Sequence, residues 1–416
     1  MMKRTILHCD CNSFFASVET VLNPAYRGVP MAVCGSREDR HGIVLAKNEE
    51  AKRYGIVTAE TIHSALKKCP HLVIAEPHHE YYIEFSRRVN EIYARYTDLV
   101  EPFGIDESWL DVTASYKLFG DGLQIAEKIR EEVKKEIGIT VSIGVSFNKT
   151  FAKLGSDYKK PDAITVINEE NFRSIVYPLP VSDLLYVGKK TAEQLVRLGI
   201  RTIGDLAAAS AQILEYNFGK NGILLHKCAS GEEDSPVTVP TDEVKSVGRG
   251  YTFRRDLRNF EECYVGILYL SEQIGAQLRA KELVCTTVSL KIKDENLITI
   301  QRQKPLQTAT DLAKEIAACA YEILREQWKS QKPIRMLTVT ALGLMDKSAA
   351  SQQISLFDSP LISNEKEEKK EKTMDDIRQK YGSTAIFAGS TMDRELGIYR
   401  KKDRFQVSRE KKEKNE

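Results

Sequence analysis

The pattern of apolar and polar residues predicts short strands and helices through the first 166 residues. Tyr82, Phe85, Val89, Ile92 and Tyr96 recur at three- and four-residue intervals, which is typical of one face of a long helix. The other expected elements are short apolar runs bounded by turn residues: strands over residues 5–10, 29–34, 43–46, 72–75, 106–112 and 140–146, and helices over residues 13–22, 48–54 and 122–136. Interleaved strands and helices of this kind indicate an α+β sheet domain.

The middle of the chain has a different pattern. Residues 182–235 are mostly helical, with glycine turns at Gly188 and Gly199, and the Pro- and Val-containing residues 235–245 are typical of a linker. From residue 246 to 344 the order strand, helix, strand, strand, helix, strand describes a split βαβ unit, with helices near residues 261–280 and 308–327. We therefore expect a separate domain after the linker.

Beyond residue 345 the chain becomes polar. Residues 365–372 are a run of eight charged side chains, which bury no apolar surface of their own. We expect residues 346–416 to be mostly disordered, with a short helix around residues 374–381.

Composition and charge narrow these possibilities only slightly. The chain has 416 residues, 42% of them hydrophobic, which is enough for about three domains. Lys and Arg total 61 against 59 Asp and Glu, so a nucleic-acid partner would be held by local basic patches. The eight cysteines and seven histidines lack the spacing of a zinc or redox site, and no segment has the roughly 18 apolar residues of a membrane span. We expect a soluble, cytoplasmic protein.

Three carboxylates lie where apolar segments end. Asp10 follows a predicted strand, and the adjacent Asp106 and Glu107 lie between two apolar segments. Neighbours on a regular strand point to opposite faces, so these two serve one site only from a turn or bulge, which Gly104 permits. Such a cluster suits Mg²⁺, which prefers oxygen ligands. On spacing alone, however, a helix cap or turn role explains each acid more simply.

Two longer segments change that weighing. Residues 6–19 (ILHCDCNSFFASVE) and 105–111 (IDESWLD) resemble two metal-binding motifs of the Y-family, translesion DNA polymerases. Residues 142–146 (SIGVS) and 148–153 (NKTFAK) are similar to the third motif, and matching elements continue to about residue 345. The resemblance implies a right-handed polymerase with a palm (1–12 and 76–166), small fingers (13–75), a helical thumb (167–234), a linker (235–245), a split-βαβ little finger (246–345) and a tail (346–416).

The resemblance also implies the reaction. Asp10, Asp106 and Glu107, with the backbone carbonyl of Cys11, would hold two Mg²⁺ ions and catalyse addition of deoxynucleotides to a primer. The substrates would be primer-template DNA and dNTPs, copied with low fidelity past damaged bases by a monomer without a membrane partner. The competing hypotheses are a two-metal phosphodiesterase and a catalytically silent DNA- and clamp-binding factor.

Further residues match the nucleotide site of the family. Phe15 corresponds to the steric gate, an aromatic ring that would collide with a ribose 2′-hydroxyl; Phe14 is grouped with it, although core packing explains Phe14 better. Lys160 matches the lysine that reaches the triphosphate. The chain departs from the commoner pattern at Glu49 and Lys52, where Tyr and Arg are usual, so Lys52 offers a point charge rather than a bidentate fork.

Two regions are candidates for DNA contacts. Gly188, Lys189 and Lys190 resemble the turn of a helix-hairpin-helix, which holds a phosphate without reading sequence, although a plain interhelical turn has the same pattern. In the expected little finger, basic side chains could contact phosphates or simply form a solvated face: Arg249, Arg254, Lys291, Lys293, Arg302 and Lys304.

A short apolar segment stands out in the polar tail. Gln353, Ile354, Leu356 and Phe357 resemble the peptide by which bacterial polymerases bind the sliding clamp. A tethered peptide of this kind would raise the local concentration of the enzyme at the primer. A polar tail also produces such a pentamer by chance, but its position directly after the last predicted domain favours the clamp hypothesis.

Overall fold

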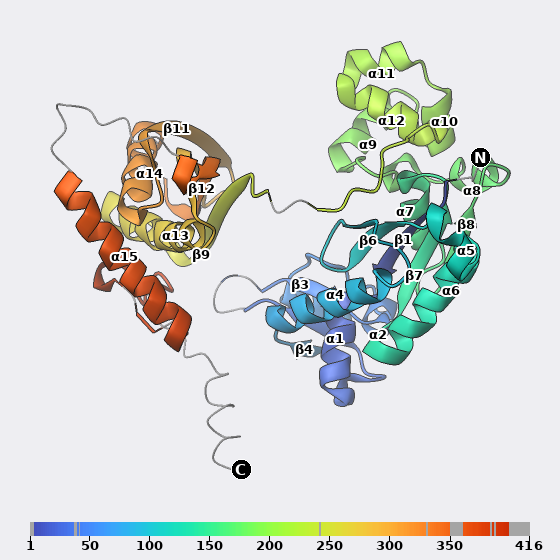
Figure 1. Cartoon of the computed structure of the whole chain (residues 1–416), viewed down its shortest axis with the longest axis horizontal. Coiled ribbons are helices and arrows are strands. Elements are labelled where there is room, and N and C mark those ends of the chain that lie inside the picture. The colour runs from blue at the N-terminus through green and yellow to red at the C-terminus, as the bar shows by residue number, and fades with distance from the viewer. Residues whose placement is uncertain are drawn as a thin grey trace. The chain divides into compact units, whose positions relative to one another are not determined.

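The computed structural model describes residues 4–36, 40, 42–240, 243–329, 332–349, 361–382, 385–386 and 388–398. The chain separates into two compact units (Figure 1). The first comprises Met1–Gly35 and Ile43–Thr241, and the second comprises Ser36–Gly42 and Asp242–Glu416.

A five-stranded sheet organises the first unit, in the order β5-β6-β1-β7-β8. Its central strand pairs antiparallel with β6 and β7, and β7 pairs parallel with β8. The strands are β1 (Ile6–Cys11), β5 (Val100–Pro102), β6 (Glu107–Asp111), β7 (Val141–Ser146) and β8 (Ile164–Ile167).

Alternate residues of β1 point to the two faces of this sheet. Leu7, Cys9 and Cys11 pack into a core with α4 (His79–Tyr93) and α6 (Gly122–Glu132). Ile6 packs on the opposite side with α7 (Lys149–Tyr158), which approaches the sheet closely. A Cβ on Gly144 of β7 would lie 1.8 Å from the carbonyl oxygen of Ala152 in α7, so this position requires glycine. Both faces are therefore covered, and the polar residues of β1 lie on the side of α7.

A smaller sheet and two helices within residues 13–75 form a lobe with its own core. Helix α1 (Phe14–Leu22) packs instead with Phe14 and Val18 in the main core and with Ala16 against the smaller sheet. The sheet order is β3-β2-β4. The other elements are β2 (Met31–Cys34), β3 (Val44–Lys47), α2 (Glu49–Arg53), α3 (Ile62–Lys68) and β4 (Val73–Ala75).

The segment after β8 is helical, as the sequence predicts, and has a separate core. Its elements are α8 (Phe172–Val176), α9 (Lys189–Arg197), α10 (Ile203–Ala208), α11 (Ala211–Phe218) and α12 (Lys220–Ser230). The remaining α-helix described in the first unit is the one-turn α5 (Tyr116–Phe119), and a π-helix over Val133–Ile137 continues α6.

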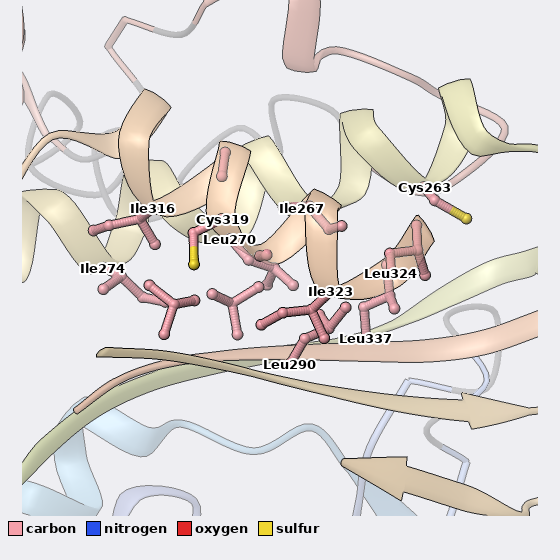
Figure 2. Close-up of a cluster of buried hydrophobic side chains, with 14 of the residues drawn as sticks. Cys263, Ile267, Leu270, Ile274, Leu290, Ile316, Cys319, Ile323, Leu324 and Leu337 are labelled. Atoms are coloured by element: carbon pink, nitrogen blue, oxygen red, sulfur yellow. The ribbon is translucent and has the colours of Figure 1, made fainter. Parts of the chain in front are cut away.

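The second unit contains the predicted order strand, helix, strand, strand, helix, strand. Its antiparallel sheet has the order β11-β10-β12-β9. Figure 2 shows side chains of both helices, such as Ile267 and Ile323, meeting Leu290 and Leu337 of the sheet. The elements are β9 (Ser246–Leu257), α13 (Phe260–Ala280), β10 (Leu283–Asp294), β11 (Thr299–Thr310), α14 (Ala313–Gln327) and β12 (Ile334–Asp346).

The predicted helix at residues 374–381 is present, but the expectation of disorder is wrong for the other described residues after 360. Helix α15 (Leu361–Tyr381) contains the charged run over residues 365–372. Leu396 and Ile398 are buried in the core of the second unit. The charged helix is held by ion pairs rather than by apolar burial, because Arg279 of α13 contacts both Glu371 and Asp375. Charge composition alone therefore misjudged this segment. The predicted clamp peptide, residues 353–357, lies outside the described residues.

Candidate active site

Strand pairing brings the three predicted carboxylates to one place. Asp10 is directly opposite Glu107 in the β1–β6 pair. Asp106 lies in the turn before β6, and its carbonyl oxygen accepts a hydrogen bond from the Cys11 amide at 2.9 Å. A Cβ on Gly104 would lie 3.3 Å from Cγ of Glu107 and 3.5 Å from Oδ1 of Asp106. Asp106 therefore lies in a turn beside Gly104, as the sequence predicts, and the shared catalytic site of the two adjacent acids stays a prediction.

The carboxylates titrate differently because their surroundings differ. Burial raises the pKa of Asp106 to about 6, and the negative charges of Asp10 and Glu107 add to the increase. Burial opposes ionisation of Glu107 as well, but the contact with His8 and the charge of Lys153 lower its pKa to about 2. The cluster thus holds at least one permanent negative charge beside a group that titrates near neutrality.

Lysine side chains occupy part of the cluster. The Lys160 ammonium lies 2.7 Å from Oδ2 of Asp10, and Lys153 forms an ion pair with Glu107. Within the described residues no group of three His, Cys, Asp or Glu side chains converges on one point as ready metal ligands. The backbone thus places the three acids next to one another, but the side chains of Asp10 and Glu107 form ion pairs with lysines.

The donor set nevertheless fits a hard divalent cation. Asp10, Asp106 and Glu107 offer carboxylate oxygens, the ligands that Mg²⁺ prefers. Burial and then the charges of Asp10 and Glu107 raise the pKa of Asp106, and a bound cation would relieve the repulsion between the three carboxylates. Unlike Asp10 and Glu107, Asp106 forms no ion pair with any described residue.

Two residues beside the cluster were not predicted as functional. His8 is fully buried, with Nδ1 2.8 Å from Oγ of Ser156 and Nε2 3.3 Å from Oε2 of Glu107. Burial lowers the pKa of His8, so the imidazole is neutral at physiological pH. Lys153 projects from α7 toward the same carboxylate. The available signal was periodicity: His8 shares a face of β1 with Asp10.

The predicted nucleotide residues fall into different environments. Phe14 is 3% exposed and belongs to the main core, in agreement with its packing interpretation. Phe15 is half-buried, and its ring stacks on Tyr82 with centroids 4.1 Å apart. Lys52 of α2 is not free, because its ammonium lies 2.5 Å from Oε1 of Glu49. The residue that replaces the usual tyrosine therefore neutralises the expected phosphate ligand.

Comparison with known proteins decides the family. The impB/mucB/samB family model matches residues 9–157, and the model of the C-terminal domain of that family matches residues 244–356. DNA polymerase IV of Acetivibrio thermocellus is 47% identical over 390 residues, covering 93% of this chain and 97% of the relative. DNA polymerase IV of Moorella thermoacetica is 38% identical, covering 92% and 94%. The chain belongs to the Y family of DNA polymerases, of the polymerase IV type.

A solved structure agrees with this assignment. A Y-family DNA polymerase chimera of Dbh and Dpo4 superposes with a TM-score of 0.74 at 26% identity, covering 82% of this chain and 99% of that chain. The chain is thus a DNA-directed DNA polymerase with the α+β fold of this family, and DNA and dNTPs are its substrates. No helix in the described part of the polymerase combines the length and apolar character that a bilayer crossing requires.

The predicted helix-hairpin-helix turn lies at the start of a helix in this polymerase. Gly188 is the N-cap of α9, and Lys189 and Lys190 are exposed in its first turn. No atom lies within 4 Å of a Cβ built on Gly188, so the surface there is open. Helix N-termini attract anions because their backbone N–H groups are free. The position suits contact with a phosphate group.

The predicted basic residues of the second unit divide between two faces of its sheet. Lys291 lies opposite Gln301 and Thr338, on the face away from the buried Leu290, and Lys293 shares that face. Arg302 is paired with Leu290 and so lies on the helix side. Two of the other three basic residues predicted with them contact side chains of the helices: Arg249 contacts Gln277 of α13, and Lys304 contacts Glu322 and Glu326 of α14.

Proposed function

We propose that this polymerase extends primers opposite damaged template bases by two-metal-ion nucleotidyl transfer centred on Asp10, Asp106 and Glu107. The observation that carries the proposal is the β1–β6 register, which places Asp10 opposite Glu107 beside the Asp106 turn. Bound to these carboxylates and to the Cys11 carbonyl, two Mg²⁺ ions would activate the primer 3′-hydroxyl and stabilise the leaving pyrophosphate. The five-stranded sheet would serve as the palm.

The protein's own residues would position the nucleotide and balance its charge. Lys160 and Lys153 now neutralise Asp10 and Glu107, and both ammonium groups lie next to the carboxylates that would bind metal. With a cation bound at these carboxylates, both lysines would be free to contact the triphosphate. The Phe15 ring would lie under the sugar and exclude a ribose 2′-hydroxyl. A small fingers lobe over residues 13–75 would cover the new base pair loosely, which favours low-fidelity copying.

DNA would be held outside the catalytic centre by sequence-independent contacts. The α9 N-terminus with Gly188, Lys189 and Lys190 would bind one phosphate, and the sheet face with Lys291 and Lys293 would bind the duplex. We infer that Gln353, Ile354, Leu356 and Phe357 dock on a bacterial sliding clamp and that the enzyme acts as a cytoplasmic monomer. A clamp pull-down should lose the protein when Leu356 and Phe357 are replaced by alanine.

Primer extension on undamaged and damaged templates tests the catalytic proposal. Asp106→Ala should lower the extension rate by about a thousandfold or more, because removing a ligand disrupts metal binding. Asp98→Ala, at an exposed acid, is the matched control and should extend normally. Shortening of the labelled primer would instead favour a phosphodiesterase, and wild type without extension would favour a silent accessory factor. Equal rates for Asp106→Ala and wild type would refute the carboxylate assignment.

A further inference from the structure

A buried hydrogen bond joins two helices behind the proposed sugar site. Glu19 of α1 is 3% exposed, and the hydroxyl of Tyr82 in α4, which is fully buried, donates a hydrogen bond to its Oε1 at 2.5 Å. Burial, and then the acceptor itself, raise the pKa of Tyr82, so the hydroxyl stays protonated. His78 Nδ1 also lies 2.9 Å from Oε1 of Glu19. A buried hydrogen bond is costly to lose, because the group left behind stays buried without that partner.

The ring of Tyr82 supports Phe15 directly. The two rings are nearly parallel, with centroids 4.1 Å apart and an interplanar angle of 12°. His79 approaches both rings edge-on, with centroids 5.8 Å from Phe15 and 5.5 Å from Tyr82. Phe15 is thus packed on one face by Tyr82 and at its edge by His79.

Helix geometry links these contacts into one unit. Phe15 and Glu19 are four residues apart in α1, so their side chains lie on the same face. Tyr82 spans that face, with its ring on Phe15 and its hydroxyl on Glu19. A shift of the Phe15 ring toward α4 would therefore displace Tyr82 and stretch the buried hydrogen bond.

Steric exclusion of a ribonucleotide requires the Phe15 ring to keep its position when a 2′-hydroxyl presses against it. A 2′-hydroxyl adds one oxygen to the sugar, and an aromatic ring that moved by about 1 Å would largely relieve the collision. Resistance to that movement must come from what lies behind the ring. In this chain Tyr82 lies there, and Glu19 holds Tyr82 in place.

We propose that Glu19 and Tyr82 are positioning residues that fix the Phe15 ring and thereby set the discrimination between deoxyribonucleotides and ribonucleotides. Neither residue contacts the nucleotide in this scheme. The inference rests on the proposed role of Phe15 as the sugar-excluding ring. It differs from that role because it assigns discrimination to a hydroxyl group and a carboxylate behind the ring.

The test compares kcat/KM for dNTP and rNTP incorporation in single-nucleotide primer extension by the full chain. Tyr82→Phe keeps the ring and removes the hydroxyl, so the dNTP/rNTP ratio should fall about tenfold while kcat/KM for dNTP changes less than about threefold. Glu19→Ala removes the acceptor of the same hydrogen bond and should also lower the dNTP/rNTP ratio. Glu19→Gln retains an acceptor oxygen and should preserve most of the ratio.

Tyr96→Phe is the matched control. Tyr96 follows the same helix, and its hydroxyl donates a hydrogen bond to Oε1 of Glu132 at 2.6 Å, so the variant loses a bond of the same kind far from Phe15. Its dNTP/rNTP ratio should equal that of wild type. An equal fall in Tyr96→Phe and Tyr82→Phe would overturn the proposal, because general loosening of the helix would then explain both.

Phe15→Ala distinguishes a failure of this inference from a failure of the proposed sugar-excluding role of Phe15. If Phe15→Ala leaves the ratio unchanged, the proposed gate itself fails. If Phe15→Ala lowers the ratio and Tyr82→Phe does not, the gate stands and the positioning role fails. The double variant should show no further loss beyond Phe15→Ala, because Tyr82 acts through that ring. Additive losses in the double variant would also contradict the proposal.

Discussion

The Lys160 ammonium lies between two carboxylates, 2.7 Å from Oδ2 of Asp10 and 2.6 Å from Oδ1 of Asp157. Burial opposes its charge, but the two acids raise the pKa of Lys160 above its usual value. A permanent positive charge is therefore held at the edge of the proposed metal site, where a triphosphate would arrive.

Removing that charge should weaken nucleotide binding. Lys160→Ala is expected to raise the KM for dNTP by about tenfold or more, because a charge-assisted contact to a phosphate is lost. Steady-state kinetics with a saturating primer-template measure this change. Lys159→Ala removes the exposed neighbouring charge and should leave the KM near that of wild type. Equal KM values for Lys160→Ala and wild type would exclude a role at the triphosphate.

The Glu49–Lys52 ion pair should weaken binding of the incoming nucleotide. Both side chains are about two-fifths exposed, and pairs of this kind contribute roughly 0.2–1 kcal/mol. Glu49→Gln frees Lys52 and removes a negative charge, so the KM for dNTP should fall about two- to fivefold with little change in kcat. Glu50→Gln, the same substitution at the next position of α2, is the control. A rise in KM for Glu49→Gln would show that Glu49 assists binding.

Proton uptake by Asp106 should compete with metal binding. Its pKa is raised to about 6, so the carboxylate is ionised above that pH and takes up a proton as the pH falls through it. Mg²⁺ affinity should be constant above about pH 6 and fall about tenfold per pH unit below it. Calorimetric titration without nucleotide avoids protonation of the triphosphate. Asp106→Asn should remove this dependence; a pH-independent affinity in wild type would contradict the assignment of Asp106 as a ligand.

The C-terminal segment should contribute to the stability of the second unit. Leu396 is completely buried in its core, so Leu396→Ala should lower the free energy of unfolding by about 2–5 kcal/mol. Met392→Ala, in the same segment, alters a side chain that is 51% exposed and should have little effect. Chemical denaturation monitored by circular dichroism provides the measurement. Indistinguishable unfolding curves for Leu396→Ala and wild type would show that this segment is not part of the folded unit.

Much of the fold followed from local patterns. Alternation and helical periodicity predicted the split βαβ unit because its strands and helices are long and amphipathic, and Gly104 correctly indicated a turn beside Asp106. The charged run over residues 365–372 led to a wrong expectation of disorder, because Arg279, the partner of Glu371, is about ninety residues away in the chain. For the same reason, the contact of Lys153 with Glu107 and that of Tyr82 with Glu19 were not predicted from the sequence. Contacts between distant segments depend on register and packing, which local composition does not encode.

The packing of Leu396 and Ile398 affects the order in which the two units fold during synthesis. The amide of Arg254, near the start of the second unit, donates a hydrogen bond to the carbonyl of Leu396, about 140 residues later in the chain. The chain must therefore be synthesised at least to residue 398 before this core is complete, whereas every strand of the five-stranded sheet ends before residue 168. During synthesis, the unit that carries Asp10, Asp106 and Glu107 therefore has every strand of its sheet long before the core of the second unit is complete.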